Sequence, residues 1–313
     1  MMTVRDAVIG AEMMTAEGCT PRIDILSGVY YAQVKSLRAM HPLRMTLFIP
    51  RTTAKKPAVI YFPGGGFTSS DYEKFAEMRF ALARAGFVVA AAEYRVIPNR
   101  FPAPVEDAKA AVRWVRAHAE EEEYGVDPDR IAVLGDSAGG YITQMLGATN
   151  DETGWDKGDF THVSSAVQAV VSLYGISDLL SIGEGFDETI QAIHLSPAVT
   201  ESLLVNGPAF KTLPAPLCET PEAAHHASAL YHVNGNEPPF LLMHGTADPL
   251  VSPLQSKHMY DTLKAHGDDV EFVMVKGAKH ADLIWHQDAV IHRVITWLKS
   301  KLGDPLSQPF EAL

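Results

Sequence analysis

A single serine stands among small residues at positions 135–140, which read Gly-Asp-Ser-Ala-Gly-Gly. The apolar run Ile131–Leu134 comes directly before it. The pattern G-x-S-x-G is typical of a tight strand-to-helix turn that holds the serine in a strained conformation above a sheet. Side chains at positions 135 and 139 would collide across such a turn, so glycine suits both. Ser137 is therefore a candidate nucleophile, and the alternative is an incidental serine at the start of a glycine-rich helix.

A serine hydroxyl becomes a nucleophile when a base accepts its proton. Of the thirteen histidines, His280 is the strongest candidate, because it follows the last predicted strand, Val270–Val275, and should reach the same edge of the sheet. His244 is the main rival, but it lies within the end of a predicted strand, where we expect a structural role. The adjacent His225 and His226 could bind a metal, but two neighbouring side chains without a carboxylate partner make a poor site, so we expect no metal there.

The base needs a carboxylate that fixes its tautomer and stabilises the imidazolium. Asp248 follows the predicted strand Phe240–Met243, and Ser137, Asp248, His280 is the chain order of the triad in α/β-hydrolases. Asp282 is closer to His280 in sequence, but its loop would have to fold back on itself. The alternative for Asp248 is a simple capping role at the next helix.

Three consecutive glycines, Gly64, Gly65 and Gly66, follow the first buried strand. Without a Cβ atom, their backbone N–H groups can approach a substrate closely. We expect the amides of Gly65, Gly66 and Ala138 to form an oxyanion hole for a tetrahedral intermediate. No Gly-Lys-Ser/Thr follows the glycines and no G-x-G-x-x-G is present there, which excludes a phosphate-binding loop and a dinucleotide fingerprint.

Alternating strands and helices must position these residues. Apolar runs predict strands at 58–62, 87–92, 130–134, 166–174, 240–243 and 270–275, and helical spacing predicts helices at 72–85, 105–119, 138–147, 256–265 and 289–301. This alternation favours an α/β fold with a mostly parallel central sheet and helices on both faces. Residues 30–34 and 43–49 predict an antiparallel hairpin at the N-terminal edge of that sheet.

Residues 176–235 break the alternation, because they contain five prolines and no clear strand. The segment is too long for a simple connection. We interpret it as a small cap or lid insertion with short helices, within a single domain that spans residues 1–313.

Composition excludes several classes of protein. The formal net charge of −12 disfavours nucleic-acid binding. The two cysteines, Cys19 and Cys218, form neither a disulfide framework nor a zinc motif, and we expect no metal and no organic cofactor. No signal-peptide pattern and no apolar run of about 18 residues is found. We therefore expect a cytoplasmic protein without a membrane span, unless a leader has been removed.

Taken together, these motifs resemble the α/β-hydrolase superfamily, in its hormone-sensitive-lipase-like and bacterial carboxylesterase branch. The resemblance covers about residues 40–300 and rests on the segments 63–67, 93–95, 101–104, 135–140, 244–249 and 277–280. It implies an α/β-hydrolase fold and hydrolysis of carboxylic esters, with short acyl chains or with acyl groups on plant polysaccharides. The oxyanion motif of that family usually begins with histidine, whereas Pro63 stands there in this chain, so we expect the loop to be held differently.

The leading hypothesis is a serine carboxylesterase in which Ser137 attacks the ester, His280 transfers the proton and Asp248 orients His280. Its expected partner is a small-molecule or glycan-linked ester, and a homodimer is an open alternative to a monomer. A serine amidase or peptidase of the same fold would use the same three residues. A non-catalytic ligand-binding member of the fold is a third hypothesis, although all three positions of the triad are filled.

Overall fold

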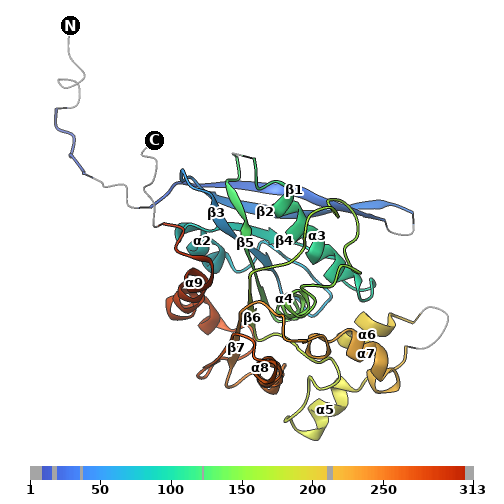
Figure 1. The fold of residues 1–313 in the computed structure, drawn as a ribbon. Coiled ribbons are helices and arrows are strands. Elements are labelled where there is room, and N and C mark those ends of the chain that lie inside the picture. Colours follow the sequence, from blue (N-terminus) through green and yellow to red (C-terminus); the bar gives the residue numbers. More distant parts are fainter. Residues whose placement is uncertain (1–8, 16–19, 36–37, 122, 210–213, 307–313) are drawn as a thin grey trace.

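An eight-stranded sheet forms the centre of the computed structural model, which describes residues 9–15, 20–35, 38–121, 123–209 and 214–306 (Figure 1). The strand order is β1-β2-β4-β3-β5-β6-β7-β8. The strands are β1 (Ile23–Lys35), β2 (Met40–Pro50), β3 (Lys56–Phe62), β4 (Val88–Ala92), β5 (Val126–Asp136), β6 (Ala169–Leu173), β7 (Phe240–Gly245) and β8 (Val270–Val275). Neighbouring strands from β4 to β8 pair in parallel, whereas β1–β2 and β2–β4 pair antiparallel. The predicted sheet with its antiparallel edge hairpin is confirmed.

Helices cover both faces of this sheet (Figure 1). One face packs against α3 (Ala103–Ala117), α4 (Ala138–Ala148) and α8 (Leu254–His266), and the other against α2 (Ala76–Arg84) and α9 (Asp288–Leu302). Every residue of β3, β4 and β6 is buried. Burial on both faces explains why these strands are continuous apolar runs rather than alternating ones.

Two elements differ from the sequence-based expectation. Helix α2 begins at Ala76 rather than near residue 72, because Phe75 adopts a left-handed conformation with φ of 56°, which an α-helix does not continue through. Strand β1 begins at Ile23, earlier than expected. As an edge strand it pairs only with β2, and exposed residues such as Ile25 and Leu26 hide the alternation that would have marked it.

The segment between β6 and β7 contains only short helical elements in its described part. They are α5 (Glu188–His194), α6 (Thr200–Asn206), η1 (Leu217–Glu219), α7 (Pro221–His226) and η2 (Ala229–Tyr231). Hydrogen bonds tie the segment to the core: Phe101 N donates to Leu204 O at 2.8 Å, and the Tyr141 hydroxyl donates to Ala227 O at 2.8 Å. A lid function for this segment stays a prediction.

In the part of the chain that the structure describes, no helix combines the length and the apolar character needed to cross a bilayer.

Candidate active site

Ser137 lies at the sharp turn between β5 and α4, with φ of 53° and ψ of −118°. A Cβ atom on Gly135 would lie 2.2 Å from the carbonyl oxygen of Gly139, and one on Gly139 would lie 2.0 Å from that of Phe62. Real Cβ atoms do not approach so closely, so both positions require glycine. The backbone N–H of Ser137 donates to Leu173 O at 2.9 Å, which ties the turn to β6.

The loops after three parallel strands bring the predicted residues together. His280, after β8, has Nε2 at 2.9 Å from Ser137 Oγ and Nδ1 at 2.8 Å from Oδ2 of Asp248, after β7. In the tautomer that suits this arrangement, Nδ1–H donates to the carboxylate and Nε2 accepts the serine proton. Trp285 anchors the loop that carries His280, because its Nε1–H donates to Lys279 O at 2.8 Å.

Asp248 is surrounded by donors that keep its carboxylate charged. Oδ1 accepts the backbone N–H groups of Leu250 and Val251 at 2.9 and 3.0 Å, and His244 Nε2 lies 3.4 Å from Oδ2. Burial alone would raise the pKa of Asp248, but the hydrogen bonds from His244 and His280 hold it well below its usual range. An ionised carboxylate therefore faces His280 Nδ1.

The rival residues have other partners. The fully buried His244 contacts Ser256 Oγ through Nδ1 at 2.8 Å and Val251 O through Nε2 at 3.0 Å. Asp282 accepts the N–H groups of Lys279 and Ile284 at 2.8 and 2.9 Å. The ring of His225 packs against Tyr231, and the described residues contain no cluster of histidine, cysteine or acidic side chains that could hold a metal ion.

The glycine loop after β3 lies directly beside the serine. A Cβ atom on Gly64 would come within 2.8 Å of Ser137 Cβ, and one on Gly65 within 2.2 Å of Ser69 O. Gly66 has φ of 56°, in the left-handed region that glycine tolerates. Within the described part of the chain, the N–H groups of Gly65, Gly66 and Ala138 donate to no acceptor. These donors are therefore free for a ligand.

Asp136 is a site residue that the sequence reasoning missed. Its Oδ1 accepts the Tyr61 hydroxyl at 2.7 Å and the Gly64 N–H at 2.9 Å, and its Oδ2 accepts Lys74 Nζ at 2.9 Å. The Tyr174 hydroxyl lies 3.4 Å from Oδ2. Burial and the nearby carboxylate raise the pKa of Tyr61 and of Tyr174, so both phenols stay protonated donors.

This network shows how the loop is held without the usual histidine. Asp136 fixes the N–H of Gly64, and the Tyr94 hydroxyl donates to Pro63 O at 2.6 Å. In the sequence, Asp136 stands out as an acidic residue at the end of a buried strand. A buried carboxylate requires hydrogen-bond partners. Those partners come from distant segments and could not be named from the sequence.

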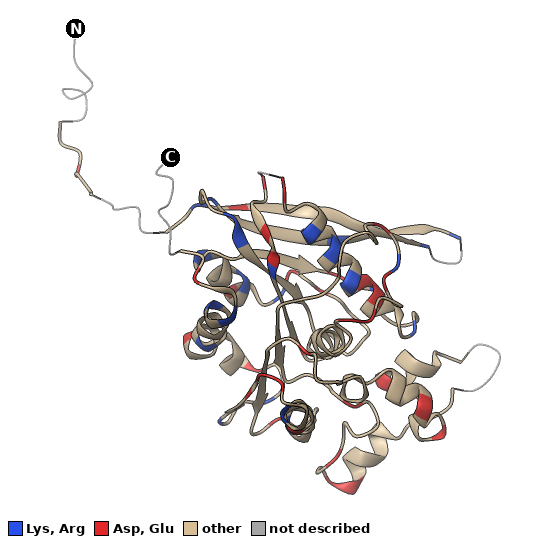
Figure 2. Cartoon of the chain, in the orientation of Figure 1, with Lys and Arg blue, Asp and Glu red and all other residues tan. Residues whose placement is uncertain are grey.

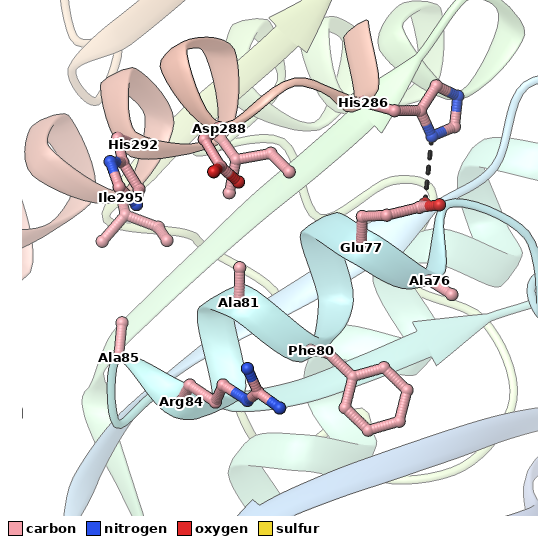
Figure 3. A pocket seen from close by; sticks show the side chains of 11 residues that line it. Ala76, Glu77, Phe80, Ala81, Arg84, Ala85, His286, Asp288, His292 and Ile295 are labelled. Carbon is pink, nitrogen blue, oxygen red and sulfur yellow. Dashed lines mark hydrogen bonds and ion pairs between the residues drawn. The ribbon is translucent and has the colours of Figure 1, made fainter. Parts of the chain in front are cut away.

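A cavity of about 680 Å³ lies between α2 and α9, on the face of the sheet that these two helices cover (Figure 3). Its polar lining includes Glu77 and His286, which pair at 3.0 Å, together with Asp288 and His292. None of Ser137, Asp248 and His280 lines it, so this cavity is separate from the serine.

The BD-FAE family model matches residues 45–263, more than half of the chain. The chain belongs to the BD-FAE family. Among curated proteins it is 31% identical to "Probable carboxylic ester hydrolase LipM" of Mycobacterium tuberculosis over 68% of this chain and 46% of that protein. It is 29% identical to "Esterase LipQ" of the same organism over 72% of this chain and 50% of that protein. The chain thus spans about half the length of these relatives.

Solved structures show the same fold for this BD-FAE member. The chain matches a "Truncated form of carbohydrate esterase from gut microbiota" with a TM-score of 0.77 and 24% identity, over 90% of this chain and 97% of the other. It matches the acetyl ester-xyloside bifunctional hydrolase from Caldicellulosiruptor lactoaceticus with a TM-score of 0.69 and 24% identity, over 91% of this chain and 98% of the other. The expected α/β-hydrolase fold and the expected resemblance to the carboxylesterase branch are confirmed.

Proposed function

We propose that the protein is a serine carboxylesterase that works through an acyl-enzyme. The observation that carries the proposal is the chain of contacts from Ser137 Oγ to His280 Nε2 at 2.9 Å and from His280 Nδ1 to Asp248 Oδ2 at 2.8 Å. A nucleophile, a base and an orienting acid within hydrogen-bond distance are what acyl transfer requires. The curated esterase relatives support the same reaction class.

In the proposed mechanism, Ser137 Oγ attacks the ester carbonyl carbon while His280 Nε2 takes the hydroxyl proton. The carbonyl oxygen becomes an oxyanion that accepts hydrogen bonds from the free amides of Gly65, Gly66 and Ala138. The imidazolium then gives its proton to the leaving alkoxide as the carbon–oxygen bond breaks. The alcohol departs and an acyl group remains on Ser137.

Water completes the cycle. His280 takes a proton from water as its oxygen attacks the acyl carbon, and returns the proton to Ser137 Oγ when the serine ester bond breaks. A carboxylic acid is released and the serine is restored, so ester and water supply all the atoms of the products. Asp248 stays ionised throughout and stabilises the imidazolium formed in both halves.

For the substrate we propose a short-chain acyl ester, free or carried by a polysaccharide. The support comes from structural neighbours described as a carbohydrate esterase and an acetyl ester-xyloside hydrolase, and the proposal extends that description to this chain. Because the glycine loop lies within contact distance of Ser137, the acyl carbonyl is the part of the substrate most closely enclosed.

The test is a series of p-nitrophenyl esters from acetate to dodecanoate, with acetylated xylan and an aminoacyl anilide alongside. We expect acetate and butyrate to be the best small substrates, and the anilide to be turned over far more slowly. Ser137→Ala should lower kcat by at least about 10⁴-fold, whereas Ser300→Ala on α9 should not change it. Unchanged ester turnover in Ser137→Ala contradicts the proposal, and faster turnover of the anilide would favour an amidase.

A further inference from the structure

Three cavities continue one another along the β1–β2 hairpin and α3. The first, of about 560 Å³, and the second, of about 220 Å³, share the lining residues Ala32, Gln33 and Asp159. The second and the third, of about 950 Å³, share Val34, Lys35 and Arg95. Shared lining residues make the three cavities one groove, which we name the hairpin groove.

One end of the hairpin groove adjoins the glycine loop. The third cavity is lined by the segment 95–99 after β4, and Ile97 N donates to Phe67 O at 2.9 Å. Phe67 follows Gly66 directly, so the wall of the groove is bonded to the proposed oxyanion loop. The hairpin contributes Val34, Lys35, His41 and Leu43 to the lining of the same cavity.

The groove is larger than a short ester requires. Its third cavity alone, of about 950 Å³, approaches the upper end of the range of about 300–1,000 Å³ for small-molecule sites, and two further cavities extend it along the hairpin and α3. At the far end lie the aromatic residues Tyr30, which is exposed, and Phe160, which is half-buried. An open groove that runs from an aromatic end to a catalytic loop suits an extended chain.

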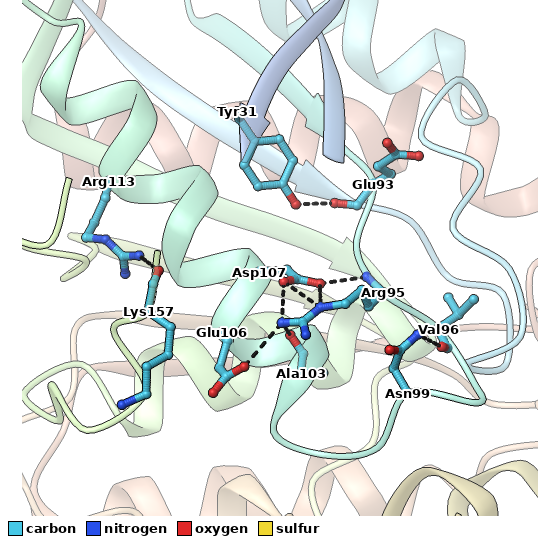
Figure 4. Close-up of polar contacts among 10 residues, drawn as sticks. All are labelled: Tyr31, Glu93, Arg95, Val96, Asn99, Ala103, Glu106, Asp107, Arg113 and Lys157. Carbon is cyan, nitrogen blue, oxygen red and sulfur yellow. Dashed lines mark hydrogen bonds and ion pairs between the residues drawn. The ribbon is translucent and has the colours of Figure 1, made fainter. Parts of the chain in front are cut away.

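The polar lining contains both basic and acidic side chains. Arg95 is bonded to Asp107 at 2.7 Å and to Glu106 at 3.1 Å, with Val96 and Asn99 beyond it (Figure 4). Lys157 and Asp159 also line the middle of the groove. In Figure 2, stretches of ribbon coloured for basic and for acidic residues lie side by side on and beside α3.

The mixed charge and the aromatic residues of the groove favour a neutral ligand rich in hydroxyl groups. A polyanion would be repelled by the net charge of −12, and a long acyl chain would have to pass the charged middle of the groove, which costs desolvation. Hydroxyl groups both donate and accept, so they match a wall of mixed sign, and the apolar faces of sugar rings match aromatic side chains.

We propose that the hairpin groove binds the neutral polysaccharide chain whose acyl ester reacts at Ser137. The inference rests on the proposed function and adds a subsite for the carbohydrate part of the substrate. The sugar chain lies along the hairpin, and its acyl group reaches over the segment 95–99 to the glycine loop.

The test separates binding from catalysis. Isothermal titration of the Ser137→Ala protein with xylohexaose, mannohexaose and cellohexaose measures binding without turnover. The groove variants are the double variant His41→Ala/Asn99→Ala at the near end and Phe160→Ala at the far end. The control is Phe80→Ala, an exposed aromatic residue in the cavity between α2 and α9 (Figure 3).

We expect at least one hexasaccharide to bind, both groove variants to weaken that binding by at least about 10-fold, and Phe80→Ala to leave it unchanged. In the active protein, the same groove variants should raise KM for the acetylated polymer and change kcat/KM for p-nitrophenyl acetate by less than 2-fold. Absence of binding to all three sugars, or equal losses on polymer and small ester, would overturn the groove proposal. Absence of p-nitrophenyl acetate hydrolysis would instead count against the proposed esterase function.

Discussion

The backbone N–H of Gly64 donates a 2.9 Å hydrogen bond to Oδ1 of Asp136, the residue directly before Ser137. One carboxylate thus links the strand end that presents the serine to the glycine loop, which we propose supplies the oxyanion donors. Its other partners, Tyr61 and Lys74, fix its position from two further segments. Because oxyanion donors must be held in place before reaction, Asp136 should act on the rate through the loop rather than through the substrate.

Asp136→Asn tests this role. The amide keeps the shape of the side chain but loses the charge that holds Lys74 and strengthens the bond to Gly64. We expect kcat for p-nitrophenyl acetate to fall by about 10–100-fold, less than the loss of a whole oxyanion donor, with KM changed by less than about 3-fold. Lys74→Gln is the control: its side chain is one-third exposed, so its loss should cost less than about 5-fold. Wild-type kcat in Asp136→Asn would show that the loop does not depend on this carboxylate.

Asp248→Asn should nearly abolish activity without unfolding the protein. An amide cannot stabilise the imidazolium and would favour the wrong tautomer of His280, so we expect kcat to fall by about 10⁴-fold. Asp282→Asn is the matched control, because Asp282 lies nearer in sequence but its carboxylate accepts the N–H groups of Lys279 and Ile284 rather than that of His280. Its kcat should stay within about 10-fold of wild type, and steady-state kinetics on p-nitrophenyl acetate compare the two. Equal losses in both variants would rule out Asp248 as the specific partner of His280.

Lys56→Met should stabilise the protein at neutral pH. Lys56 is 4% exposed, and burial lowers its pKa to about 8, whereas the unfolded chain has the ordinary value of about 10.4. Between these values the unfolded state binds more protons, so wild-type stability should rise with pH across this window, and the full cost of the buried charge is present below pH 8. We expect Lys56→Met to gain about 1–2 kcal/mol at pH 7 and to flatten this rise.

Urea unfolding at pH 7, 8.5 and 10 measures this effect. Lys55→Met is the control, since Lys55 is half exposed and its ion pair with Glu120 lies at the surface, where such pairs contribute about 0–1 kcal/mol. A loss of stability in Lys56→Met at pH 7 would mean that the ammonium is well solvated in the folded state.

Ser228→Ala tests whether residues 176–235 unfold with the core. The fully buried Ser228 Oγ donates to Ala224 O at 2.7 Å and accepts Leu179 N–H at 3.0 Å. Losing it leaves a buried donor without an acceptor, which should cost about 1–3 kcal/mol. We expect a single thermal transition shifted to lower temperature, and a much smaller shift for Ser196→Ala, because Ser196 is half-buried and its Oγ accepts the Ala198 N–H at 3.2 Å in an exposed bond. A separate early transition would show that this segment is an independent unit.

The sequence allowed prediction of features that are encoded locally. Gly135 and Gly139 mark the turn at Ser137 because each position excludes a side chain by backbone contact alone. His280 and Asp248 could be placed because the loops after parallel strands must meet at one edge of the sheet. The structure brings these residues within hydrogen-bond distance.

Features that depend on contacts between distant segments could not be predicted from the sequence. Tyr61, Lys74 and Tyr174 converge on Asp136 from three separate segments, and nothing in their local sequence marks them as partners. The hairpin groove is formed where β1, α3 and the segment 95–99 meet. Such surfaces follow from tertiary packing rather than from periodicity.

The most direct measurement of the central claim is active-site labelling with a fluorophosphonate, followed by intact mass and peptide mapping. A serine activated by a neighbouring histidine reacts with this probe, whereas ordinary serines do not. We predict one adduct per chain, located on Ser137, with loss of esterase activity in proportion to labelling and no adduct in Ser137→Ala or His280→Ala. An unlabelled protein that still hydrolyses esters, or an adduct on another residue, would contradict the account.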